Sequence, residues 1–412
     1  MHKAVTIVAA TLLLEVVEGC SPRTPLPKEP PMEHRTSERT TFAADTAFLR
    51  ANGEVVVLAS PGGGRVAVSP KYQGRVMTSA VADDGDSLGW IHRAFIAAGK
   101  TGTPFDNYGG EDRFWLGPEG GQFALYFPPG APFSFDAWQT PAAFQEGAWD
   151  VTHRTETAIG LAHRMSVKNY GGATFDVEVT REIAALGRAA VVERLGVALD
   201  DRVRWVAFES TNAIRNAGTS AWTEDKGLVS IWILGMFAPA PDAKVVVPFA
   251  KDGGGPIVND AYFGKVPPDR LAIDEAKGTL VFTCDGKHRS KIGLGPRRAL
   301  PVAGSYSASA RLLTIVQYDK PAAATRYVNS MWETQKEPYG GDVVNSYNDG
   351  PPAPGKPSLG GFYELETSSP AAALVPGKTL VHAHRTFHFV GDPAVLEPIA
   401  QKVLGVSLAT LK

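Results

Sequence analysis

Short runs of alternating apolar and polar residues, separated by glycine and proline, dominate the sequence from about residue 42 onward. Such alternation is typical of β-strands, because successive side chains of a strand point to opposite faces of the sheet. Clear examples occupy residues 53–58, 66–69, 122–127, 174–179, 203–208, 228–233 and 312–318. The chain holds 43 glycines and 31 prolines, which supply the turns that so many short strands require. We therefore expect an all-β fold.

Helical periodicity is confined to a few short segments. Residues 88–98 place apolar side chains on one face, Asp319 could cap a second helix, and Asp392 opens a third that should end near Gly405. No break rich in proline or serine interrupts the chain after its first 41 residues. We therefore predict one domain over residues 42–412, with a few short helices.

The N-terminal residues 1–19 are typical of an export signal. Residues 4–14 form an uninterrupted apolar stretch, and Gly19 places a small residue directly before Cys20. This arrangement resembles the lipobox of bacterial lipoproteins, whose cysteine is lipidated after cleavage. The proline-rich residues 20–41 then predict an extended tether. We expect an exported protein of the bacterial cell envelope, anchored to a membrane by a lipid on Cys20; the alternative is an ordinary secretory signal in which Cys20 is incidental.

The charge balance restricts the class of partner. Lys and Arg number 41 against 43 Asp and Glu, a net charge of −2. A nucleic acid is therefore not expected as a partner, because phosphate neutralisation needs a basic surplus or stripe. No apolar run reaches the roughly 18 residues of a membrane-spanning helix. We also expect a monomer that uses no cofactor.

A glycine-rich segment over residues 107–123 concentrates side chains suited to a sugar site. Aromatic faces stack on the apolar faces of sugar rings, while carboxylates and arginine bind hydroxyl groups through charge-assisted hydrogen bonds. The alternative is a hairpin with a salt-bridged rim. The candidate binding residues are Tyr108, Glu111, Arg113 and Trp115, and Glu119 is a candidate acid or base.

Near the C-terminus, residues 382–388 predict a strand with His382 and His384 on one face, and Glu364 and Glu366 share a face of the strand before it. Such faces can supply general acids and bases. Histidines at alternate strand positions more often form a solvated sheet face, so a metal site is not expected.

The run Tyr363-Glu364-Leu365-Glu366-Thr367, followed by Pro370-Ala371 and Pro376-Gly377-Lys378-Thr379, resembles the C-terminal signature of galactose mutarotase-like (aldose 1-epimerase-like) proteins. Weaker similarities are Tyr108-Gly109-Gly110 and the turn at residues 212–218. The resemblance implies a β-supersandwich with a carbohydrate cleft across its concave sheet. It also implies that Glu366, in its Leu-Glu-Thr setting, is the catalytic base.

The sequence departs from this family at the catalytic acid. The family places a histidine just before the central asparagine-containing turn, whereas this chain has Ser210-Thr211-Asn212 there. Mutarotation needs an acid as well as a base. His153, His382 or His384 are candidate substitutes.

Further polar residues are candidates for substrate binding. Lys226 lies in a polar turn, for which an exposed turn lysine is the alternative interpretation. Residues 343–352 contain the sharp turn Asn-Asp-Gly-Pro-Pro, which either only reverses the chain or forms a polar loop at the cleft mouth. The remaining candidates are Asn212, Asn345, Tyr347, Asn348 and Asp349.

These observations leave three hypotheses open. The first is a mutarotase-like protein that performs acid/base chemistry on a sugar, with Glu366 and Glu119 as candidates. The second is a glycan lyase or hydrolase, in which Tyr108, Tyr347 or His153 would act as base or acid. The third is a glycan-binding lipoprotein without catalysis.

Overall fold

The structure is a computed structural model that describes residues 40–102 and 104–411. The described residues form one compact unit. The expected export signal, Cys20 and nearly all of the expected tether lie outside the described residues. Among the helices that are described, none is long and apolar enough to cross a membrane.

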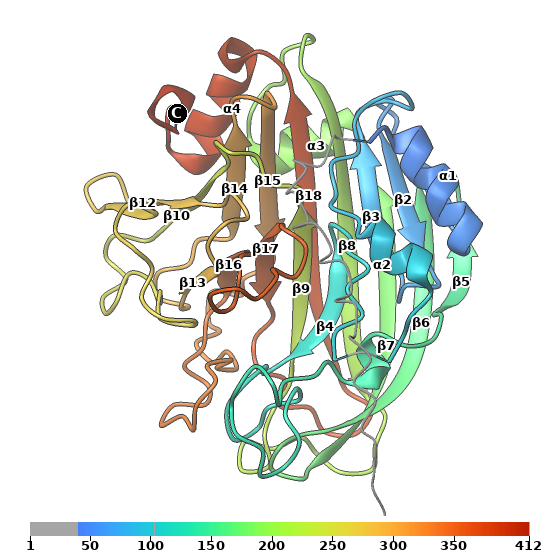
Figure 1. Ribbon diagram of the computed structural model, residues 1–412, viewed down its shortest axis with the longest axis vertical. Helices are drawn as coiled ribbons and strands as arrows, with labels where there is room; N and C mark the ends of the chain where they lie inside the picture. The colour runs from blue at the N-terminus through green and yellow to red at the C-terminus, as the bar shows by residue number, and fades with distance from the viewer. Residues whose placement is uncertain (1–39, 103, 412) are drawn as a thin grey trace, which may run out of the picture. The chain divides into compact units, whose positions relative to one another are not determined.

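The larger layer of the described fold is a ten-stranded antiparallel sheet (Figure 1). Its long central strands pair over up to twelve residues, and their alternate side chains are buried. In spatial order the strands are β11 (Leu271–Asp274), β12 (Thr279–Thr283), β10 (Lys244–Pro248), β14 (Val302–Ser307), β15 (Leu312–Tyr318), β18 (Thr379–Val390), β8 (Arg204–Asn216), β7 (Thr174–Ala185), β6 (Ala158–Lys168) and β5 (Asp150–Arg154).

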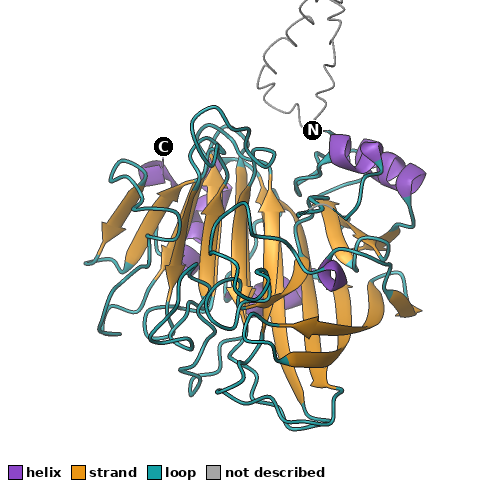
Figure 2. Cartoon of the chain, turned by 60° about the horizontal axis from the view of Figure 1, so that its bottom comes forward, coloured by secondary structure: helices purple, strands orange, loops and turns teal. Residues whose placement is uncertain are grey.

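A five-stranded antiparallel sheet forms the second layer, and a three-stranded sheet adjoins it (Figure 2). The five strands are buried at nearly every position, which means that both of their faces are covered. Their order is β13 (Ser290–Leu294), β16 (Val344–Asn348), β17 (Tyr363–Ser368), β9 (Ser230–Phe237) and β4 (Arg113–Gly117), and the smaller sheet comprises β1 (Val56–Ala59), β2 (Arg65–Ser69) and β3 (Arg75–Ala80). The prediction of an all-β sandwich is confirmed.

The helices are short and peripheral. They are α1 (Phe42–Asn52), α2 (Arg93–Ala98), α3 (Arg188–Leu195) and α4 (Pro393–Leu404), with 3-10 turns at Ala142–Phe144 and Leu408–Leu411. The expected third helix is confirmed as α4, which ends at Gly405 in the left-handed conformation (φ 69°). The sequence patterns missed α1 and α3.

Three local predictions were wrong. In each case contacts with distant segments determine the backbone conformation, in place of the local sequence pattern. Residues 88–91 are extended, since Trp90 donates its backbone N–H to Met236 O (2.9 Å), so α2 begins only at Arg93. No helix follows Asp319, because the backbone there bonds to another loop, as in Tyr327 N to Tyr339 O (3.1 Å).

The expected strand at residues 122–127 is instead an irregular loop whose apolar side chains are buried without a strand ladder. Tyr126 packs parallel to Trp138, with ring centroids 6.0 Å apart, and donates its hydroxyl to Leu116 O (3.1 Å). The segment 343–352, expected to turn or to form a polar loop, contains the strand β16. Both departures bring side chains to the outer face of the five-stranded sheet.

Candidate functional site

Strand register places a set of polar and aromatic side chains on one face of the five-stranded sheet. Residues directly opposite each other in antiparallel strands share a face. Glu366 on β17 lies opposite Leu234 on β9, which lies opposite Arg113 on β4. The opposite face carries Leu365 and Thr367, which face the ten-stranded sheet. The first face is therefore free to form a site.

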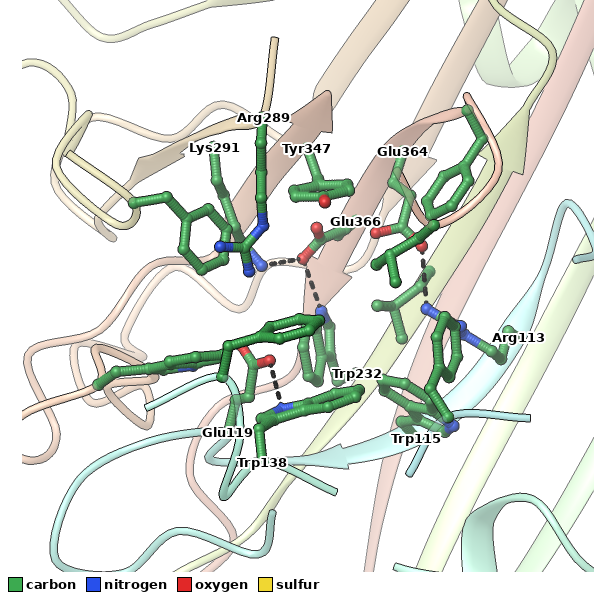
Figure 3. A pocket seen from close by; sticks show the side chains of 17 residues that line it. Arg113, Trp115, Glu119, Trp138, Trp232, Arg289, Lys291, Tyr347, Glu364 and Glu366 are labelled. Atoms are coloured by element: carbon green, nitrogen blue, oxygen red, sulfur yellow. Dashed lines mark hydrogen bonds and ion pairs between the residues drawn. The ribbon is translucent and has the colours of Figure 1, made fainter. Parts of the chain in front are cut away.

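Loops enclose this face and form a small pocket (Figure 3). Its lining combines aromatic walls with three carboxylates and three cationic side chains. The lining residues are Phe105, Arg113, Trp115, Glu119, Phe135, Trp138, Trp232, Leu234, Phe263, Arg289, Lys291, Trp332, Tyr347, Leu359, Phe362, Glu364 and Glu366.

Glu366 is held at the pocket by one of its two oxygens. Its Oε2 accepts hydrogen bonds from Lys291 Nζ (2.8 Å) and from Trp232 Nε1 (2.9 Å). Its Oε1 is buried and has no hydrogen-bond partner among the described residues. A buried carboxylate oxygen without a donor is costly, so this oxygen is available to a ligand hydroxyl.

Lys291 and Glu366 form a buried ion pair, with side-chain exposures of 5% and 1%. Burial works to lower the pKa of the Lys291 ammonium, but Glu366 and the other pocket carboxylates raise its pKa overall. The lysine is therefore charged and fixes the orientation of Glu366. This pairing leaves the carboxylate of Glu366 with one fixed and one free oxygen.

Glu119 approaches the same pocket from a loop and is held by Trp138, whose Nε1 donates to Oε1 (3.0 Å). Burial raises the pKa of the Glu119 carboxyl, and the charge of Glu366 acts in the same direction. Lys291 opposes these effects without cancelling them. The pocket thus holds a carboxyl group with a raised pKa beside one that is paired with a cation.

Glu364 forms the third carboxyl group and accepts a hydrogen bond from Arg113 Nη2 (2.9 Å). Burial raises the pKa of Glu364, while the Arg113 charge lowers it. The Arg113 guanidinium also stacks on Trp115, 3.8 Å from the ring centroid. Two of its nitrogens, Nε and Nη1, have no partner among the described residues, so this side also retains unused donors.

The aromatic walls come from both the sheet and the loops. Trp115 and Trp232 meet edge to face, with ring centroids 5.7 Å apart, on adjacent strands. Trp138 and Trp332 stack with centroids 6.4 Å apart and belong to two loops distant in sequence. Rigid aromatic faces with a few fixed polar groups are the usual composition of a small-molecule site.

The structure brings together six of the residues predicted from sequence. They come from two segments that are about 250 positions apart, yet β4 and β17 both pair with β9. The six residues are Arg113, Trp115, Glu119, Tyr347, Glu364 and Glu366.

The predicted histidines lie elsewhere. His382 and His384 are buried between the two large sheets, where each bonds to Thr367 Oγ1, at 3.0 and 2.9 Å. Burial lowers the pKa of His382 to about 3 and that of His384 to about 4, so both are neutral at physiological pH. Because Thr367 and Glu366 are neighbours on a strand, these histidines lie behind the sheet that carries the pocket. They are therefore separated from it by β17.

Glu111 and Asn212 are also fully buried away from the pocket. Glu111 Oε2 lies 2.7 Å from His388 Nε2, in a pair that joins the two sheets. Asn212 donates to Ser210 O (3.1 Å), within the ten-stranded sheet. The segment at the usual position of the family histidine therefore does not reach the pocket.

Tyr108, His153 and Lys226 lie outside the pocket for different reasons. Tyr108 packs on Tyr72, with centroids 4.4 Å apart. His153 is exposed on the edge strand β5 and lies 3.1 Å from Glu182. Lys226 is exposed in a turn, as in its alternative interpretation.

The segment 343–352, which contains β16, acts mainly as a support for the pocket. Among its predicted residues only Tyr347 lines the pocket, and its hydroxyl donates to Asp349 Oδ1 (3.0 Å). Asn348 binds the backbone at Gly286 and His288. Asn345 Nδ2 donates to Ile292 O (3.3 Å) and to Tyr262.

Several pocket residues were missed in the sequence. Trp232 stands in a predicted strand, and its large aromatic side chain was a usable signal. Arg289 and Lys291 alternate around the start of β13, a short strand that the patterns did not identify. Leu234 lies on β9, between Arg113 and Glu366 in the sheet. The remaining missed side chains come from irregular loops and carried no local signal: Phe105, Phe135, Trp138, Phe263, Trp332, Leu359 and Phe362.

The described side chains contain no group of three or more His, Cys, Asp or Glu residues placed to hold a metal ion. The carboxylates of the pocket are instead bound by lysine, arginine and tryptophan.

The fold and site define an all-β sandwich protein. Its pocket has aromatic walls and contains carboxylates that are paired with cations. The chain belongs to the family described as "Family of unknown function (DUF6786)", whose model matches residues 40–412. None of the curated proteins matches the sequence.

Several solved structures similar to this chain are described as aldose epimerases or galactose mutarotase-like proteins. A candidate aldose 1-epimerase from Escherichia coli K12 is 12% identical, with a TM-score of 0.49 over 81% of this chain and 98% of that one. A galactose mutarotase-like protein from Lactobacillus casei is 11% identical, with a TM-score of 0.44 over 81% of this chain and 100% of that one. An aldose epimerase homologue from C. elegans is 9% identical, with a TM-score of 0.40 over 82% and 99%. These likenesses concern the fold alone.

Proposed function

We propose that this protein binds a sugar in the aromatic pocket and performs acid/base chemistry on it, with Glu366 as base and Glu119 as acid. The observation that carries this proposal is the free Oε1 of Glu366. It is buried without a partner, while Oε2 is fixed by Lys291 and Trp232. A fixed carboxylate with one open oxygen has the properties required of a general base.

The two carboxyl groups suit opposite roles. In mutarotation, Glu366 would take the proton of the anomeric hydroxyl while Glu119 donates a proton to the ring oxygen. The bond between the anomeric carbon and the ring oxygen then breaks, and the open-chain aldehyde forms. Ring closure on the other face returns both protons. The raised pKa of Glu119, caused first by burial, supports its role as the acid.

The aromatic side chains support a sugar as the ligand. Trp115, Trp138 and Trp232 supply apolar ring faces, while Arg113 retains unpaired donors for hydroxyl groups. A screen of monosaccharides by thermal unfolding tests binding, because a ligand that binds only the folded state raises its Tm. At 100 times the Kd, the stabilisation is about 2.7 kcal/mol. Absence of a Tm shift with every sugar would reject the proposal.

Glu119→Gln should reduce turnover about 10²- to 10⁴-fold, the usual contribution of a general acid. Because the acid must be protonated, wild-type activity should fall as pH rises through the raised pKa of Glu119, and the variant should lose this alkaline limb. A pH–rate profile measures both effects. Glu193→Gln, on the exposed face of α3, is the control and should keep the wild-type profile. An unchanged alkaline limb in Glu119→Gln would exclude Glu119 as the acid.

The raised pKa of Glu119 also predicts how the stability of Glu119→Gln, compared with wild type, changes with pH. A folded-state pKa above the unfolded value means that the folded protein binds its proton more tightly, so stability falls as pH rises between the two values. The variant should lose this decline. Its unfolding free energy relative to wild type should therefore be greater at neutral pH than at pH 4.

We also propose that the protein is located in the bacterial cell envelope, where a lipid on Cys20 anchors it to a membrane. Cys20→Ser should move the full-length protein from the membrane fraction to the soluble fraction and abolish labelling by a radioactive fatty acid. Cys284→Ser is the matched control, because Cys284 is buried and should not be lipidated. Membrane retention of the unlabelled Cys20→Ser protein would reject the lipid anchor.

A further inference from the structure

Among the three cations of the pocket, Arg289 differs from the other two in lacking a carboxylate partner. Arg113 pairs with Glu364 and Lys291 pairs with Glu366. Arg289 forms no salt bridge with any side chain in the described part of the protein. It is half-buried, so its charge is not simply dissolved in water.

The side chain of Arg289 is nevertheless fixed in place. Its guanidinium lies 3.6 Å from the ring centroid of Phe263 and 5.3 Å from that of Phe135. Stacking of this kind uses the flat face of a guanidinium and leaves the N–H groups at its edge to form hydrogen bonds. One of these bonds reaches the Tyr347 hydroxyl. Its Nε is buried and has no hydrogen-bond partner among the described atoms. Figure 3 shows Arg289 and Lys291 pointing into the pocket from the same side.

Asp349, which is bonded to the pocket residue Tyr347, is already occupied by other donors. Asp349 accepts the Tyr347 hydroxyl (3.0 Å) and the backbone N–H groups of Gly360 (3.0 Å) and Gly361 (2.8 Å). These bonds hold the loop that brings Leu359 and its neighbours to the pocket. Asp349 therefore anchors a loop and does not neutralise Arg289.

The charges of the pocket also indicate that Arg289 has no carboxylate partner in the described part of the protein. Lys291 and Arg113 each have a carboxyl partner, whereas Glu119 is held by Trp138 and forms no salt bridge with Arg289. The charge of Arg289 is therefore not offset by a direct ion pair. An empty binding site can carry such an unpaired cation, because the missing negative charge arrives with the ligand.

We propose that the sugar bound in this pocket carries a negatively charged group, a carboxylate or a phosphate, which Arg289 binds. This inference rests on the proposed function and adds a substrate class to it. The charged group accepts hydrogen bonds from the edge of the Arg289 guanidinium, while the sugar ring lies against the tryptophans and its anomeric hydroxyl reaches Glu366. The ligand is then an acidic sugar and not its neutral parent.

The test compares matched pairs of probes by calorimetric titration of the full-length protein. Glucuronate and galacturonate are paired with glucose and galactose, and glucose 6-phosphate and galactose 6-phosphate form the phosphate arm. We expect at least one acidic sugar to bind about 10- to 100-fold more tightly than its neutral parent, the range expected for charge-assisted hydrogen bonds. The arm that gains affinity identifies the anionic group as carboxylate or phosphate.

Arg289→Met should reduce this ratio of affinities to near one, and Arg289→Lys should restore only part of it, because lysine keeps the charge but lacks the planar fork. Arg164→Met, an exposed arginine on β6, is the matched control and should keep the ratio. A further readout needs no variant: wild-type affinity for the acidic sugar should weaken with added salt more than affinity for the neutral sugar.

The outcomes separate this inference from the proposed function. If neutral sugars bind as tightly as their acids, Arg289 does not select the ligand, and the proposed sugar chemistry stands without it. An affinity ratio that survives Arg289→Met would equally overturn the assignment to this residue. If no neutral or acidic sugar binds at all, both proposals fail.

Discussion

Glu366→Gln should abolish turnover, with a loss of at least about 10²- to 10⁴-fold, while the pocket still binds the sugar. The amide has nearly the shape of the carboxylate, and its oxygen can still accept the hydrogen bond from Trp232 Nε1. It cannot remove a proton, however. Steady-state kinetics together with calorimetric titration separate the loss of chemistry from any loss of binding.

The same variant leaves Lys291 buried without its ion-pair partner, so its Tm should also fall. Glu366→Gln combined with Lys291→Met should recover stability but not turnover. Glu182→Gln, at a carboxylate on β7 outside the pocket, is the control and should retain the wild-type Tm and turnover. Turnover near the wild-type level in folded Glu366→Gln would remove Glu366 from the mechanism.

Asp112→Ala should cause the largest loss of stability, about 3–5 kcal/mol, the usual effect of breaking a buried ion pair. Asp112 and Arg181 are both fully buried and paired, and Ser210 Oγ also donates to Asp112 Oδ2 (2.7 Å). The variant would leave the charge of Arg181 buried between the sheets without a partner. Denaturant titration measures this change in the free energy of unfolding.

Asp112 directly precedes β4, so this pair also fixes the strand that carries Arg113 and Trp115 into the pocket. Asp112→Ala combined with Arg181→Met should recover part of the lost stability, because no buried charge is then left alone. Asp201→Ala, in an exposed pair with Arg188, is the matched control and should change stability by less than about 1 kcal/mol. A similarly small effect of Asp112→Ala would contradict this description of the core.

The strands were the most predictable part of the fold. Alternation identified β7 and β8, whose alternate side chains are buried. The strands β9 and β15 were identified by their apolar and β-branched residues; β9 is buried at every position and β15 at most positions. The local sequence pattern failed at residues 122–127, where glycine and proline on both sides allow apolar side chains to be buried from an irregular loop. It also failed after Asp319, where backbone bonds to the segment near Tyr339 replace those of a helix.

The site was predictable where its residues share a strand face. Glu364 and Glu366 alternate on β17, and Arg113 and Trp115 alternate on β4, so both pairs carry a local signal. His382 and His384 carried the same signal, but alternation alone does not predict which face of a strand lies toward the pocket. Their face contacts Thr367 between the sheets.

The other half of the pocket depends on pairing between distant segments. Lys291 reaches Glu366 because β13 pairs with β16 and β16 pairs with β17, a register that no local pattern contains. Trp138 and Trp332 meet only because two irregular loops fold over the same sheet face. Such contacts are set by the tertiary fold.

The most direct test of the proposed chemistry is the rate at which the protein interconverts the α and β anomers of a sugar that it binds, measured by NMR magnetisation exchange. We predict that wild-type protein accelerates this interconversion and that Glu366→Gln, with the ligand still bound, does not. If a sugar binds the pocket and its anomers exchange no faster than in buffer, the protein is not a mutarotase-like catalyst on that sugar, and the central claim is contradicted.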